Sequence, residues 1–160
     1  MITLDPTTVA SAAPAPAPLR LAGYAALFNV RDGGGDTILP GAFARTLAVH
    51  AAAGDRLPLY WQHRPDQRIG WIDSAAEDGR GLRVTATLDD AQGMAAQAVR
   101  QGKVTGLSFG YRVTRGRTDA SGRLLDAVDL FEVSLVTRPM QPMARVHLVA
   151  RAPDAPAIAA

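Results

Sequence analysis

Residues 103 to 113 read KVTGLSFGYRV, and this stretch determines the fold class that we expect. Apolar side chains occupy every second position, as in a β-strand with one buried face: Leu107, Phe109, Tyr111 and Val113. The opposite face carries Ser108 between Gly106 and Gly110, whose lack of side chains leaves the hydroxyl uncrowded. A serine hydroxyl is a poor nucleophile until a base takes its proton. Ser108 is therefore a candidate nucleophile only if the chain also supplies a base and a group that orients the base.

The segments on either side of this stretch are strands and short helices punctuated by glycine. Strands are predicted over residues 19–28, 56–63, 68–76, 81–88, 123–137 and 145–150, and helices over residues 42–53 and 91–101. Asp89 or Asp90 is expected to cap the second helix, and residues 116–122 to form a polar hairpin loop. Many strands without βαβ alternation predict an α+β domain. We expect it to be built on a small and mainly antiparallel β-barrel, or on a curled sheet, with a few short flanking helices.

Composition narrows both the extent of the domain and its chemistry. Residues 1–18 and 151–160 are rich in alanine and proline and are expected to be flexible tails, which leaves residues 19–150 as the folded domain. The chain has no cysteine, so disulfides, thiolate catalysis and cysteine-based zinc sites are excluded. A net charge of +2 with interspersed signs gives no reason to expect nucleic acid as a partner. Neither a membrane span nor a signal peptide is recognisable.

His63 is the best candidate for the base. It ends the predicted strand LPLYWQH, and Pro65 biases Arg64 away from helical conformation, so the imidazole is expected where a strand meets a loop. His50 lies in a helical pattern among alanines, and His147 alternates with valine and leucine near the tail. Both of these are expected to have structural roles.

Glu132 is the candidate orienting group. In DLFEVSLVT, the residues Phe131, Val133 and Leu135 form an apolar face, and Glu132 interrupts a partly apolar opposite face. A carboxylate in such a strand is costly unless it is paired or hydrogen-bonded. It either faces water at the mouth of the barrel or accepts a hydrogen bond from His63 and fixes its tautomer. Asp126 and Asp129 are weaker candidates because they lie nearer to the loop.

Three other patterns have simpler explanations. Residues 106–110 satisfy G-x-S-x-G, the nucleophile elbow of a serine esterase, but that elbow needs a helix after Ser108 and a later histidine, which only His147 could supply. Asp32 and Asp36 flank three glycines. This pattern predicts a turn and not a cation-binding loop, because too few ligands follow to complete a calcium shell. A solvated hairpin explains a group of arginines as well as a phosphate patch does: Arg112, Arg115 and Arg117.

The order of these residues and their surroundings resemble a known family. The matching segments run in sequence from Gly23 to Val146: GYAALFN, DGGGDTILPGAF, LPLYWQH, GLRVTATL, GKVTGLSFGY and DLFEVSLVTRPMQPMARV. The chain resembles the prohead (procapsid) maturation proteases of tailed bacteriophages and related gene-transfer particles, a family similar in fold to herpesvirus assemblin. LSFGY and FEVSLVTRP are the most specific segments. The departures are Arg64, where an acidic residue is expected, and residues 140–142, which replace a small residue followed by asparagine.

The resemblance implies a serine endopeptidase, with Ser108 as nucleophile, His63 as general base and Glu132 as the third member. The loop after the strand of Glu132 offers oxyanion donors, either backbone amides near Thr137 and Arg138 or the Arg138 side chain. No metal or organic cofactor is expected.

The resemblance also implies a partner and a place of action. The partner would be the precursor of the major capsid protein, whose scaffolding segment is trimmed, and the protease often trims its own terminus. A homodimer is compatible with the family, and neither nucleic acid nor a membrane is expected as a partner. The work would be done inside the immature procapsid in the host bacterial cytoplasm, without secretion. A non-enzymatic capsid or scaffold module is the remaining alternative, and it would leave His63 and Ser108 on opposite faces of the sheet.

Overall fold

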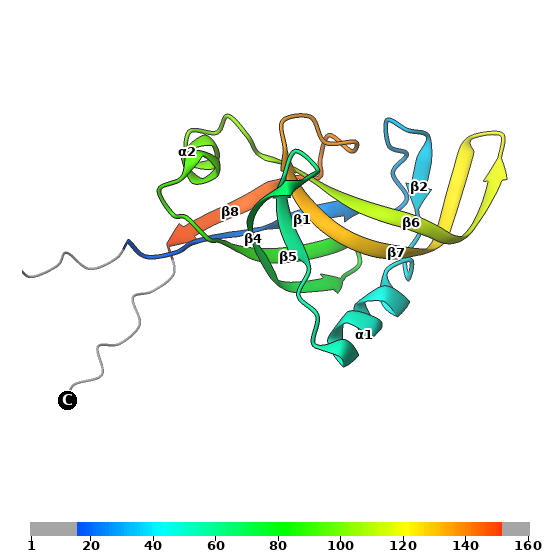
Figure 1. The fold of residues 1–160 in the computed structure, drawn as a ribbon. Coiled ribbons are helices and arrows are strands. Elements are labelled where there is room, and N and C mark those ends of the chain that lie inside the picture. The colour runs from blue at the N-terminus through cyan, green and yellow to red at the C-terminus, as the bar shows by residue number, and fades with distance from the viewer. Residues whose placement is uncertain (1–15, 152–160) are drawn as a thin grey trace, which may run out of the picture.

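The computed structural model describes residues 16–151, which form eight strands and two helices (Figure 1). In chain order these are β1 (Leu19–Leu27), β2 (Asp36–Ile38), α1 (Ala44–Ala53), β3 (Pro58–Trp61), β4 (Arg64–Glu77), β5 (Gly81–Leu88), α2 (Met94–Arg100), β6 (Gly106–Asp119), β7 (Gly122–Val136) and β8 (Val146–Arg151). The predicted α+β class is confirmed. The proposed tails lie almost entirely outside the described residues, so the tail boundaries stay predictions.

All eight strands belong to one mixed sheet, with the order β2-β7-β3-β4-β5-β1-β8 and with β6 paired to β7. Two of the pairings, β2 with β7 and β3 with β7, are parallel. The expected closed barrel is wrong, because β6 and β8 share no ladder. They approach each other only through an isolated bridge between Gly106 and Arg145. Beyond that bridge β6 follows β7 outward, and the sheet stays open.

The β6–β7 hairpin is the longest feature of the sheet and extends beyond the other strands (Figure 1). The expected loop over residues 116–122 is largely wrong, because cross-strand pairing continues to Asp119 and Gly122. Three register shifts interrupt the ladder. At one of them Gly110 pairs with Glu132 while Tyr111 pairs with Leu130, so Phe131 is left over as a bulge.

α1 packs against β7 and is capped from a distant strand. Its first turn has no capping side chain of its own. Instead the Glu77 carboxylate accepts hydrogen bonds from the backbone amides of Gly41 (3.0 Å) and Phe43 (2.7 Å), which places negative charge at the positive end of the helix. Gly54 ends α1 with a φ of 68°, as its glycine predicts.

α2 lies near β8, at the end of the molecule opposite to the tip of the β6–β7 hairpin (Figure 1). The predicted caps Asp89 and Asp90 are wrong, since Gly93 occupies the N-cap position and no side chain caps the helix. Asp90 instead accepts the Gln92 amide in the preceding turn.

The core lies between the curled strands and is built mainly from aliphatic side chains. Its fully buried members include Leu59, Leu82, Leu130, Val133 and Leu135. Phe131 departs from the predicted apolar face, because the bulge turns it outward and leaves it 52% exposed.

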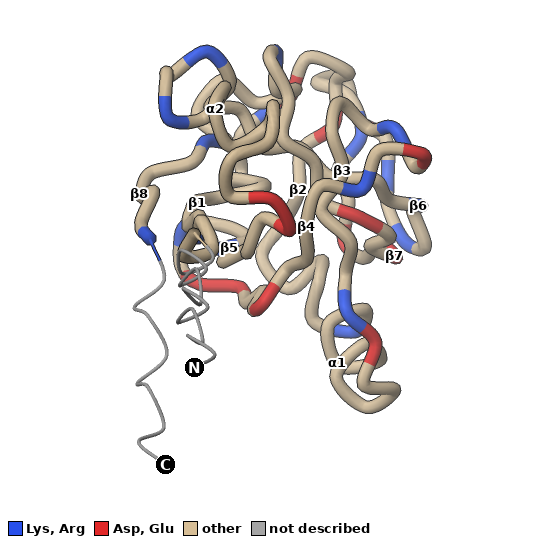
Figure 2. The backbone as a smooth tube through the Cα atoms, turned by 60° about the vertical axis from the view of Figure 1, so that its left-hand side comes forward, with Lys and Arg blue, Asp and Glu red and all other residues tan. Residues whose placement is uncertain are grey.

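Within residues 16–151, neither helix has the length and hydropathy to cross a bilayer. Acidic and basic residues are scattered over the described backbone (Figure 2), as the interspersed charges of the sequence predict.

Candidate active site

His63 lies in a tight turn. Trp61 pairs with Arg64 across the β3–β4 hairpin, so Gln62 and His63 form a two-residue connection. Both have positive φ, 52° and 58°, which is the type I′ arrangement that glycine and asparagine usually occupy. The expectation that His63 ends a strand is therefore wrong by two residues. Non-glycine residues in this region cost about 1–3 kcal/mol each and are found preferentially at functional sites.

The His63 imidazole contacts Glu132 directly. Its Nδ1 lies 2.6 Å from Glu132 Oε1, so the structure brings these two predicted residues together. The carboxylate is almost buried, whereas the imidazole side chain is 43% exposed. Because an ionised carboxylate only accepts hydrogen bonds, Nδ1 must donate, and Nε2 is then the unprotonated nitrogen of neutral His63.

Glu132 determines the acidity of the imidazole. The hydrogen bond to Glu132 raises the pKa of His63 above its usual value of 6.5, partial burial lowers it by less, and the negative charge of Glu132 adds a further increase. Arg64, the neighbouring cation, is paired with Asp66 at 3.1 Å in solvent. The protonated imidazole is thus stabilised beside a carboxylate, as general acid–base chemistry requires.

Ser108 lies on the same face as these groups. It pairs directly with Ser134 across the β6–β7 ladder, and Gly110 pairs with Glu132. Directly opposed residues share one face of a sheet, so Ser108, Ser134 and Glu132 project to the same side. Ser134 Oγ lies 3.2 Å from the backbone nitrogen of His63, which places the histidine turn on that side as well. This arrangement is not the one expected of a non-enzymatic module.

The Ser108 hydroxyl is uncommitted. The residue is buried, yet its oxygen has no hydrogen-bond partner within the described part of the chain. The Ser108 oxygen also keeps some contact with solvent. Among the described residues, His50 Nδ1 is the one side-chain polar atom that is both fully buried and without a partner, so the unpartnered Ser108 oxygen is not fully buried. A free hydroxyl with access to solvent is what a nucleophile needs.

The remaining histidines have structural contacts. His50 Nε2 lies 2.9 Å from the carbonyl oxygen of Leu130, which ties α1 to β7. His147 is exposed on β8 and packs edge-on against Tyr24. β6 continues as strand for eleven residues after Ser108, so the helix of a nucleophile elbow does not form.

The weaker acidic and basic candidates are paired with one another. Asp129 binds Arg45 and Arg112, and Asp126 binds Arg117. The pairs across the hairpin therefore explain Arg112 and Arg117 without a phosphate.

The glycine-rich loop is a turn, as predicted. Asp32 accepts the amides of Gly34 and Asp36. Asp36 is buried and held by both Arg123, at 2.6–2.7 Å, and the Tyr111 hydroxyl, at 2.6 Å. No cluster of three or more potential metal ligands occurs between residues 16 and 151.

Ser134 contacts both His63 and Glu132, and its sequence pattern alone does not single it out. It donates a hydrogen bond to Glu132 Oε2 at 2.5 Å and accepts one from the His63 amide. Its position two residues after Glu132 on the same strand face was the available signal.

The predicted oxyanion loop follows β7. Arg138 is exposed there, and the Thr137 amide donates to Gln62 Oε1 at 3.3 Å. The loop is thus linked to the turn that carries His63.

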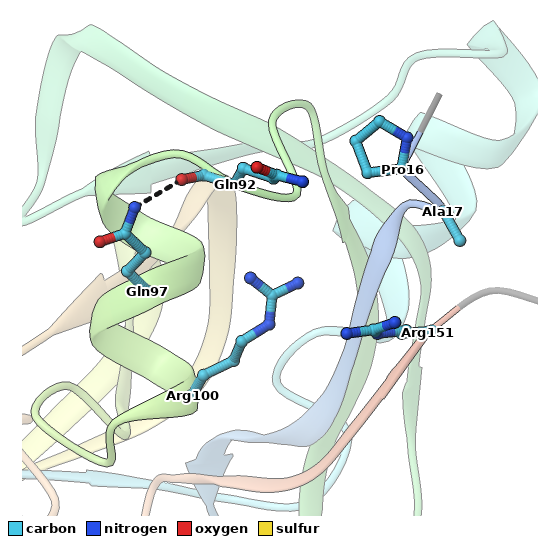
Figure 3. A pocket seen from close by; sticks show the side chains of 6 residues that line it. All are labelled: Pro16, Ala17, Gln92, Gln97, Arg100 and Arg151. Carbon is cyan, nitrogen blue, oxygen red and sulfur yellow. Dashed lines mark hydrogen bonds between the residues drawn. The ribbon is translucent and has the colours of Figure 1, made fainter. Parts of the chain in front are cut away.

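A cavity of about 310 Å³ lies away from these residues, between α2 and the ends of the chain's first and last strands (Figure 3). Arg100 and Arg151 line it together with uncharged residues, and it contains none of the predicted site residues. The candidate site lies instead where the β6–β7 face meets the turn between β3 and β4.

Comparison with known proteins shows the family of the chain. Residues 9–156 match the family described as caudovirus prohead serine protease. The chain belongs to this family. It is 34% identical over 131 residues to the prohead protease of Enterobacteria phage HK97, an alignment that covers 78% of the chain and 57% of the phage protein. The chain therefore spans little more than half the length of this relative.

The fold of this family member is also similar to a herpesvirus protease. The crystal structure of KSHV protease with a hexapeptide phosphonate inhibitor superposes with a TM-score of 0.52 at 13% identity, covering 84% of the chain and 66% of the KSHV protein. The predicted similarity to the fold of herpesvirus proteases is confirmed, although the sheet of this chain is not closed into a barrel.

Proposed function

We propose that this chain is a prohead maturation protease, a serine endopeptidase that cleaves the precursor of the major capsid protein. The observation that carries the proposal is the 2.6 Å contact between His63 Nδ1 and Glu132 Oε1, on the face that also holds the free hydroxyl of Ser108. Family membership supplies the reaction class, and the contact supplies a base whose tautomer is fixed.

The proposed reaction uses three side chains. Ser108 Oγ attacks the scissile carbonyl while His63 Nε2 takes the hydroxyl proton. Glu132 holds Nδ1–H and stabilises the imidazolium that results. The imidazolium then protonates the leaving amine, and the acyl-enzyme bond to Ser108 is hydrolysed by water with His63 again acting as base. General acid–base catalysis of this kind contributes about 10²–10⁴-fold.

The oxyanion donors are proposed to come from the loop after β7. The Thr137 amide is occupied by Gln62 Oε1, so the amide or guanidinium group of Arg138 is the better donor. Removing one donor from such a site costs about 10²–10³-fold in rate. The cleavage rates of Arg138→Ala and Arg138→Lys would separate the two groups. Both substitutions keep the backbone amide, so only a role of the side chain makes the rate depend on which residue is introduced.

The substrate and setting follow the family. We propose that the protease works without a cofactor and cleaves two targets, the scaffolding segment of the capsid precursor and its own terminus. Both cleavages would take place within the immature procapsid in the host bacterial cytoplasm. A homodimer of the protease is part of this proposal, because assembly inside a capsid brings many copies together.

The decisive experiment is mass spectrometry of the capsid precursor co-expressed with the protease. Wild-type protein should produce a shortened capsid protein and reveal the cut site, whereas Ser108→Ala and His63→Ala should not, although both should remain folded. His147→Ala is the matched control and should cleave normally. Full cleavage by Ser108→Ala would exclude the mechanism. Activity that survives His63→Ala but is lost in His147→Ala would favour the elbow-type esterase.

A further inference from the structure

We propose that Ser134 is a positioning residue that holds the Glu132 carboxylate and the His63 turn in one geometry. The inference rests on the proposed function, because it assigns Ser134 to the pair that would activate Ser108. Ser134 itself would not touch the substrate.

The first argument is that Ser134 completes the coordination of the carboxylate. Glu132 Oε1 accepts from His63 Nδ1 at 2.6 Å, and Glu132 Oε2 accepts from Ser134 Oγ at 2.5 Å. With one oxygen held by each partner, the carboxylate cannot rotate about its terminal torsion without losing a hydrogen bond. That torsion is otherwise broad and only weakly restricted in glutamate.

The second argument is that the same hydroxyl anchors the histidine backbone. The single Ser134 proton is donated to Glu132, so its oxygen lone pairs are free to accept the His63 amide at 3.2 Å. His63 has a φ of 58°, a conformation that persists only where neighbouring contacts hold it. Ser134 therefore fixes both ends of the interaction, the carboxylate and the backbone that carries the imidazole.

The third argument is location. Ser134 is fully buried, so water cannot replace its hydroxyl, and it lies directly opposite Ser108 in the β6–β7 ladder. A shift of β7 at this position would move the carboxylate, the histidine turn and the nucleophile relative to one another. Misplacement of reacting groups by about 1 Å can cost about 10²-fold in rate.

The test measures the His63 imidazole directly and does not require proteolysis. Nitrogen and proton NMR of Ser108→Ala protein would follow the His63 pKa and the Nδ1–H resonance, with and without Ser134→Ala. Glu132 is the charged group that acts on His63, since Arg64 is paired with Asp66. Glu132→Gln in the same background gives the His63 pKa without the carboxylate.

Positioning by Ser134 predicts that Ser134→Ala lowers the His63 pKa toward the Glu132→Gln value and broadens Nδ1–H by exchange with water. An unchanged pKa and a sharp Nδ1–H would overturn the proposal. A higher His63 pKa in Ser134→Ala would also overturn the proposal. It would mean that the Ser134 hydrogen bond only weakens the negative charge of Glu132 and does not fix the position of the carboxylate.

Thr46→Ala is the matched control. The Thr46 hydroxyl is also buried and accepts an amide of β7, that of Leu130 at 3.0 Å, but it does not contact Glu132. It should lose stability while the His63 resonances stay in place. If Ser134→Ala does not fold, Ser134→Cys keeps the volume, weakens both hydrogen bonds and should shift the same resonances in the same direction.

Cleavage provides the second readout. Ser134→Ala in the active protein should lower kcat up to about 100-fold with little change in KM, and Ser134→Thr, which retains the hydroxyl, should recover part of it. If wild-type protein cleaves no capsid precursor, the proposed function fails, and the NMR result still decides whether Ser134 positions the pair.

Discussion

Gly110 lies directly opposite Glu132 in the β6–β7 ladder, and a Cβ atom at position 110 would stand 2.6 Å from Glu132 Oε1. The oxygen in question is the one that accepts from His63. The glycine two residues after Ser108 therefore makes room for the carboxylate, in addition to leaving space near the hydroxyl.

Gly110→Ala should displace the carboxylate and lower the rate of cleavage by about 10²-fold. The fold should survive, because the methyl group meets the end of a side chain and not backbone. The measurement is the cleavage rate alongside the thermal midpoint. Gly79→Ala is the control, since a Cβ there meets nothing within 4 Å. Equal cleavage by both variants would show that the space at Gly110 is not needed.

The pH dependence of cleavage should report the His63–Glu132 contact. Only neutral His63 can act as base, and its pKa is raised chiefly by the hydrogen bond to Glu132. The acid limb of kcat/KM should therefore have its midpoint above about 6.5, the ordinary histidine value. Glu132→Gln should move this midpoint down and lower the rate by up to about 10⁴-fold, as loss of the orienting carboxylate does in related triads.

The same contact gives a stability signature with a defined sign. A pKa raised by folding means that the protonated pair stabilises the fold at pH values below the unfolded pKa, and that this contribution is lost as pH rises through the folded pKa. The free energy of unfolding of wild type minus that of Glu132→Gln should thus shrink from about pH 6 to pH 8. This range is chosen because the ordinary pKa of histidine is about 6.5. A difference that grows over this range would contradict the contact.

Much of the sheet was predictable because its patterns are local. β5 matches its prediction residue for residue, since alternation and flanking glycines define it, and Gly54 ends α1 as expected. The bulge at Phe131 was not predictable, because it arises from the pairing register of two strands. Closure of the barrel failed for a similar reason, since it depends on whether β6 and β8 pair over more than one bridge.

The candidate site shows the same division between local and long-range information. His63, Ser108 and Glu132 could be chosen from residue type and strand position, and the resemblance to a family gave them roles. The turn that carries His63 was hidden, because Gln62 and His63 are poor residues for a type I′ turn and only tertiary contacts hold them there. Ser134 was overlooked because a strand serine has no distinctive pattern until its partners are known.

Tyr111→Phe should destabilise the junction between the glycine-rich loop and the hairpin. The Tyr111 hydroxyl donates to buried Asp36 at 2.6 Å, and a hydrogen bond to a charged group contributes about 1.5–3 kcal/mol. The hydrogen bonds from Arg123 are the main reason that the Asp36 pKa is lowered. Stabilisation of this kind is present above the ordinary aspartate pKa and is lost as pH falls through the lower, folded value. Urea unfolding of both proteins should therefore show a gap at neutral pH that closes in acid.

Phe131→Gln and Leu135→Ala should separate the two sides of β7. Strict alternation puts both residues in the core, but the bulge leaves Phe131 exposed while Leu135 is fully buried. Leu135→Ala should cost about 2–5 kcal/mol through the cavity it leaves. Phe131→Gln should cost no more than about 1 kcal/mol, the value of its exposed contact with the Arg112 guanidinium. Chemical denaturation of the two variants measures both costs, and a loss at Phe131 as large as that at Leu135 would mean that the strand is regular and that Phe131 belongs to the core.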